Sequence, residues 1–117
     1  MSPLTITVRD AATGPVLKIS GDLDHETAPE LREAMDGLTV ATGRLLVLDL
    51  AGLDFCDSSG ISALLTARNL AGEQGGTIAL AAVPSHTARI LRITGLDQVL
   101  TIHPDATTAI ARSSAAS

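Results

Sequence analysis

Apolar and polar positions alternate at the start of the chain. Leu4, Ile6 and Val8 are separated by polar residues, and the alternation resumes through Val16 and Ile19. A period of two is typical of a strand with one buried face. The two segments therefore predict an antiparallel hairpin.

Two later segments are apolar almost throughout, "LLVLDL" at 45–50 and "TIALAAV" at 77–83. Runs of this kind are typical of strands that are covered on both faces and have parallel neighbours. Between them, residues 61–74 place Ile61 and Leu64 at helical spacing. Residues 45–83 therefore predict a strand–helix–strand unit.

The remaining pattern adds helices over 28–38 and 86–94, a strand over 99–103, and a last helix that begins at Pro104. Thr27 and Glu30 have the spacing of a capping box at the start of the first of these helices. The order of elements predicts an α/β fold. We expect a mixed sheet of about five strands with about four helices packed against it.

The length of 117 residues fits one domain, which we expect over 1–112, followed by a disordered tail over 113–117. The hydrophobic fraction is 45%, and Phe55 is the only aromatic residue, so the core must be aliphatic. The net charge is −5 and the Lys and Arg residues are not clustered. The acidic charge and the near absence of aromatic residues argue against a nucleic-acid partner, which would require a basic surface or aromatic stacking platforms.

The sequence gives no indication of export or of a membrane partner. The first residues lack a basic segment followed by an apolar one, and apolar runs are well short of the roughly 18–20 residues of a spanning helix. Cys56 is the only cysteine, so an internal disulfide and a multi-cysteine zinc site are excluded. We expect a soluble cytoplasmic protein that is monomeric when free.

The stretch "FCDSSGIS", residues 55–62, joins the first apolar strand to the following helix. In the simplest interpretation Asp57 or Ser58 caps the helix and Gly60 eases a tight bend. A hydrolase would use Ser58 or Ser59 as nucleophile and a histidine as base. The candidate bases are His25, His86 and His103, and none of these lies in a recognisable catalytic motif.

Two other kinds of chemistry are disfavoured. Asp22, Asp24 and His25 in "GDLDHE" have the chemistry of metal ligands, but such residues in a loop are more often solvated or cap a helix. A phosphate-cradling loop would need a lysine, and Lys18 is the only one. We therefore expect neither a metal nor a cofactor.

A covalent switch is the remaining interpretation of the turn. A serine at a helix N-terminus is accessible to a kinase, and the free N–H groups there can accept a phosphate without unfolding the helix. The added charge, next to Asp57 on an acidic protein, would act on the binding of a partner instead.

These motifs together resemble the STAS domain family, specifically its small stand-alone bacterial anti-sigma factor antagonists. The resemblance runs from about Leu4 to Ala111, and the turn after the apolar strand is its most specific part. It is carried by "GDLDHETA", "LLVLDLAGLDFCDSSGISALL", "GGTIALAAV" and "RILRITGLDQVL".

The resemblance implies a binding module that is a kinase substrate rather than an enzyme. The unphosphorylated form would bind an anti-sigma factor with serine kinase activity and free the sigma factor. Phosphorylation of Ser58 would switch binding off, and a serine phosphatase would reverse it. The partner-binding residues implied are Asp22, in place of the family's usual glutamate, Asp24, Asp57, Ser58, Ser59 and Gly60. The alternative is a STAS scaffold that is not phosphorylated, as a subunit of a lipid or anion transport system.

Overall fold

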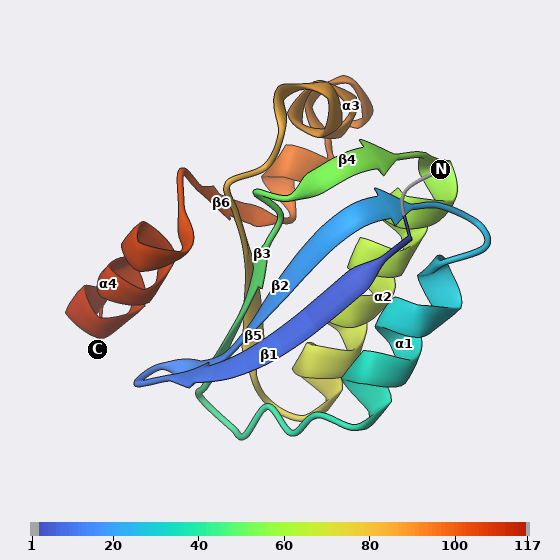
Figure 1. Cartoon of the computed structure of the whole chain (residues 1–117). Helices are drawn as coiled ribbons and strands as arrows, with labels where there is room; N and C mark the ends of the chain where they lie inside the picture. The colour runs from blue at the N-terminus through green and yellow to red at the C-terminus, as the bar shows by residue number, and fades with distance from the viewer. Residues whose placement is uncertain (1–2, 117) are drawn as a thin grey trace.

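The computed structural model describes the backbone of residues 3–116 and the side chains of residues 3–111. Within this range the chain forms six strands and four α-helices (Figure 1). In chain order the elements are β1 (Thr5–Ala11), β2 (Gly14–Leu23), α1 (Ala28–Asp36), β3 (Leu45–Asp49), β4 (Leu53–Cys56), α2 (Ser58–Glu73), β5 (Thr77–Ala81), α3 (Ser85–Thr94), the 3-10 helix η1 (Leu96–Gln98), β6 (Thr101–His103) and α4 (Ala106–Ala116).

The strands form a mixed sheet in the order β1-β2-β3-β5-β6. β1 and β2 are antiparallel, as expected of the hairpin, and the other pairs are parallel. The short strand β4 was not expected, and it pairs in parallel with the end of β2. The predicted α/β fold with a mixed sheet and four helices is confirmed, with six strands in place of about five.

Helices cover both faces of the sheet. α1 and α2 lie side by side on one face, and α4 lies on the opposite face (Figure 1). The central strand β3 is buried on both sides, as its apolar run predicts: Leu46 and Leu48 belong to the core beneath α1 and α2, whereas Leu45 and Val47 pack with the alanines of α4.

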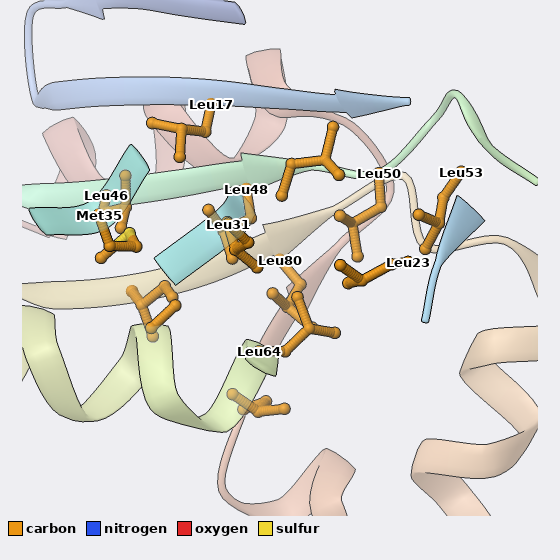
Figure 2. Packing of buried hydrophobic residues seen from close by; sticks show 14 of the residues in the cluster. Leu17, Leu23, Leu31, Met35, Leu46, Leu48, Leu50, Leu53, Leu64 and Leu80 are labelled. Carbon is orange, nitrogen blue, oxygen red and sulfur yellow. The ribbon is translucent and has the colours of Figure 1, made fainter. Parts of the chain in front are cut away.

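The larger core is aliphatic, in agreement with the composition. It contains leucines from strands β2 to β5, which meet Leu31 and Met35 of α1 and Leu64 of α2 (Figure 2). The side chains of Leu48, Leu64 and Leu80 are fully buried. This core fixes α2 against the sheet and so determines where its N-terminus lies.

Three boundaries differ from the expectations. The segment "GDLDHE", which begins at residue 21, is expected from the sequence to be a loop, but β2 continues to Leu23 because it pairs with β4. Helix α1 ends at Asp36 rather than at residue 38. Residues 113–116 have helical backbone as part of α4, where a disordered tail was expected, and Ser117 lies outside the described residues.

The helices described between residues 3 and 116 are all too short or too polar to cross a membrane.

Candidate functional site

The turn from β4 to α2 presents the candidate serine to solvent. Asp57 is the N-cap of α2, and its carboxylate accepts a hydrogen bond of 3.0 Å from the N–H of Gly60. Ser58 is the first residue of the helix and is exposed, while Ser59 is half-buried. Asp57 therefore caps the helix, and the hydroxyl of Ser58 is left accessible.

The end of β2 lies beside this turn. Asp22 and Leu23 are in register with Phe55 and Cys56 of β4, and the N–H of Asp57 donates to the Leu23 carbonyl at 3.4 Å. This pairing brings the β2 end, which carries Asp22 and is followed by Asp24, next to the serine turn. The sheet therefore makes the predicted residues of the two segments neighbours, and their use as one partner-binding surface stays a prediction.

The loop between β2 and α1 is held by internal hydrogen bonds. The hydroxyl of Thr27 donates to the Asp22 carbonyl at 2.7 Å and accepts from the N–H of Asp24 at 2.9 Å. The Asp24 carboxylate accepts from the N–H groups of Glu26 and Thr27. The predicted capping box is wrong, because the Thr27 side chain makes no cap hydrogen bond and is used within the loop instead.

Gly60 allows α2 to approach the sheet closely. A Cβ built on Gly60 would collide with the carbonyl oxygen of Leu23 and lie 2.6 Å from the Cys56 sulfur. The first turn of α2 therefore rests on the ends of β2 and β4 with no room for a side chain. The role predicted for Gly60 in shaping the turn is consistent with this packing.

Replacing Thr27 by valine should loosen the loop that carries Asp24. The substitution keeps the shape of the side chain but removes two hydrogen bonds in a partly buried loop. We expect a loss of about 1–2 kcal/mol in the free energy of unfolding, measured with urea. Hydrogen exchange of the Asp24 amide should also accelerate. The same change at the exposed Thr7 of β1 is the control, and equal effects at both positions would contradict the role given to Thr27.

The thiol of Cys56 is buried and is not activated. Only 3% of the residue is exposed, and burial, with a smaller contribution from the charge of Asp57, raises the thiol pKa from 9.0 to about 12. Alkylation requires the thiolate, so this cysteine is a packing residue rather than a nucleophile.

We expect Cys56 to react with iodoacetamide at pH 8 only after unfolding in urea, as followed by mass spectrometry. The pKa of the thiol is higher in the folded state than in the unfolded state. The stability that the neutral thiol contributes to the fold is therefore fully present below about pH 9 and is lost as the pH rises toward 12. Stoichiometric labelling of the native protein would contradict this environment.

The enzymatic alternatives find little geometric support. His25 shares a surface groove with Ser59, but His86 hydrogen-bonds to the neighbouring Thr87 and His103 lies on β6. Among residues 3–111 no hydrogen bond joins a histidine to Ser58 or Ser59. Nor does that part of the chain contain a group of three His, Cys, Asp or Glu side chains placed to hold a metal ion.

The sequence is similar to known proteins along most of its length. Residues 6–102, from β1 to β6, match the family model described as "Mlab, STAS domain". The chain is 31% identical over 96 residues to the anti-sigma F factor antagonist of Paenibacillus polymyxa, which covers 81% of this chain and 82% of that protein. It is 33% identical over 95 residues to the anti-sigma-F factor antagonist RsfB of Mycobacterium tuberculosis, which covers 81% of this chain and 77% of that protein.

A solved structure shows the same fold. The crystal structure of an anti-sigma factor antagonist from Mycobacterium paratuberculosis superposes with a TM-score of 0.82 and is 28% identical. The match covers 94% of this chain and 93% of that one. The range matched by the family model, residues 6–102, includes the turn that carries Ser58.

Proposed function

Because the chain belongs to the STAS domain family, we propose that it is an anti-sigma factor antagonist whose binding is switched off by phosphorylation of Ser58. In this proposal the unphosphorylated protein binds an anti-sigma factor with serine kinase activity and so frees the sigma factor. The names of the relatives at 31% and 33% identity support the antagonist role. The kinase, and a serine phosphatase that restores the active form, are what the family resemblance implies, and the accessible hydroxyl of Ser58 is compatible with both.

The exposure of Ser58 is the observation that carries this proposal. The residue is the first of α2, directly follows the capping Asp57, and lies where β2 and β4 both end. A kinase that binds this end of the sheet can reach the hydroxyl without unfolding any element. The N–H groups of Ser58 and Ser59, which find no acceptor among the described residues, are positioned to meet a phosphate.

The residues around Ser58 have two different roles in this proposal, contact with the partner and positioning of α2. Asp22 and Asp24, at the end of β2, would contact the partner and orient it by charge. Asp57 and Gly60 keep α2 in place, so that Ser58 and Ser59 remain presented. In this proposal the protein contributes no catalytic group of its own, because the kinase supplies both the nucleotide and the catalytic residues.

Phosphopeptide mapping of the protein from its native cells tests the proposal. We expect phosphate on Ser58 alone, removed by phosphatase treatment, and co-purification of the unphosphorylated form with a kinase that modifies Ser58 in vitro. Absence of phosphate under every growth condition, together with co-purification of membrane transport components, would instead favour the scaffold of a lipid or anion transport system.

A further inference from the structure

A shallow groove of about 280 Å³ lies between the first halves of α1 and α2. This volume is below the roughly 300–1,000 Å³ of typical small-molecule sites, and it suits one or two side chains of a partner protein. The groove reaches Ser59 at the N-terminus of α2, so it is continuous with the turn that carries Ser58. Its walls are formed by Ala28, Pro29 and Arg32 of α1 and by Ser59, Ser62 and Ala63 of α2.

The charge of the groove differs from that of the rest of the protein. Arg32 lies on its wall and has no salt-bridge partner among the described residues, and His25 lines the same groove. Within residues 3–111 no carboxylate lines this groove, whereas Glu30 and Glu33 of α1 line a different groove next to β1. A chain of net charge −5 therefore presents a positive, largely apolar groove next to the proposed phosphorylation site.

We propose that this groove receives a segment of the anti-sigma factor that carries an aliphatic side chain and a carboxylate, with the carboxylate paired to Arg32. The inference rests on the proposed function and adds the chemistry of the partner. The small side chains Ala28 and Ala63 leave space for the aliphatic group, and Arg32 is the charge that selects an acidic neighbour for it.

An acidic partner segment also explains how one phosphate could end binding. The phosphate on Ser58 would lie at the end of the groove and repel a carboxylate bound there. Asp22, at the end of β2, and Asp24, in the loop that follows, carry the opposite charge and suit a positive group of the partner. The positive charge of Arg32 and the negative charges of these acidic residues together fix the direction in which the partner lies across the surface.

Charge reversal at Arg32 provides the first test. The probe is the anti-sigma factor that co-purifies with the protein from its own bacterium and phosphorylates Ser58. Arg32→Glu should weaken its binding about tenfold, measured by titration calorimetry. Arg44 is also exposed and lies in the loop before β3. Arg44→Glu makes the same change in net charge and should leave binding unchanged.

Filling the groove provides the second test. Ser62 is exposed on the groove wall, and Ser62→Trp should weaken binding at least about tenfold by occupying the space. Ser85→Trp at the exposed start of α3 is its control. A scan of Asp and Glu to Lys in the anti-sigma factor should then yield one variant that restores the binding of Arg32→Glu.

The outcomes separate the two proposals. If the wild-type protein binds no kinase, the proposed function fails and the groove assignment fails with it. If the wild type binds but Arg32→Glu and Ser62→Trp bind equally well, only the groove assignment is overturned. Rescue by a charge-reversed partner carboxylate would identify the segment that occupies the groove.

Discussion

Replacing Ser58 by aspartate should weaken binding of the anti-sigma factor about tenfold, and phosphorylation of Ser58 should weaken it roughly 30- to 150-fold. A phosphate carries about −1.5 to −2 charges. At roughly 6 Å from one partner carboxylate and an effective dielectric of about 40, the repulsion is on the order of 2–3 kcal/mol. Aspartate carries one charge and should produce about half of this free-energy change. Titration calorimetry with the unmodified, phosphorylated and substituted proteins measures the series.

The effect should fall on binding and leave the fold intact. Ser58 is exposed, and the two N–H groups at the start of α2 favour a negative charge at this position. The melting temperature of Ser58→Asp should therefore stay close to that of the wild type. A large loss of stability would mean that the variant disrupts the turn rather than the interface.

Two further variants separate charge from position. Ser58→Ala should take up no phosphate and should retain most of the affinity, since only a small hydroxyl is lost. Ser85→Asp places the same charge at the exposed first residue of another helix, α3, and should not change binding. If Ser58→Asp bound as tightly as the wild type, or if Ser58→Ala were still phosphorylated, the switch would not be at this serine.

The sequence predicts the elements that bury long apolar runs, because their pattern is local. The strand at 45–50 and the helix that follows are read directly from the spacing of their leucines. β4 carries no such pattern, because it has only four residues, and Asp54 and Phe55 in its middle are exposed. Its strand conformation depends on pairing with the end of β2, at a register that shifts between Gly21 and Asp22 and that no local pattern encodes.

The candidate site also combines features that a local pattern predicts with features that depend on tertiary pairing. Asp57, Ser58 and Gly60 are predictable because capping and tight turns are made by neighbouring residues. The closeness of the β2 end to this turn is not predictable, because it depends on the pairing of β2 with β4. The spacing of Thr27 and Glu30 predicts a capping box, but in the fold the Thr27 hydroxyl donates its hydrogen bond to the Asp22 carbonyl instead. The position of Arg32 in a groove beside α2 depends on the packing of α1 against α2, which no local sequence pattern predicts.

Replacing Gly60 by alanine should lower the free energy of unfolding by about 1–3 kcal/mol, although alanine is the better helix former. The new methyl group would collide with the Leu23 carbonyl and the Cys56 sulfur, so α2 or the strand ends must move. Neither group is flexible enough to give way, because the carbonyl is backbone and Cys56 is buried. Urea unfolding of the variant measures the loss.

The same substitution at Gly72 is a matched control on the same helix. A Cβ there would meet no atom within 4 Å, so Gly72→Ala should stabilise the protein by about 0.5–1 kcal/mol through helix propensity alone. Opposite signs at the two glycines would locate the cost of Gly60→Ala in the contact between α2 and the strand ends. Because that contact also positions Ser58, Gly60→Ala should in addition slow phosphorylation by the kinase, while Gly72→Ala should not. Equal stabilisation at both positions would show that α2 does not rest on the β2 end, and the surface proposed for the partner would lose its structural basis.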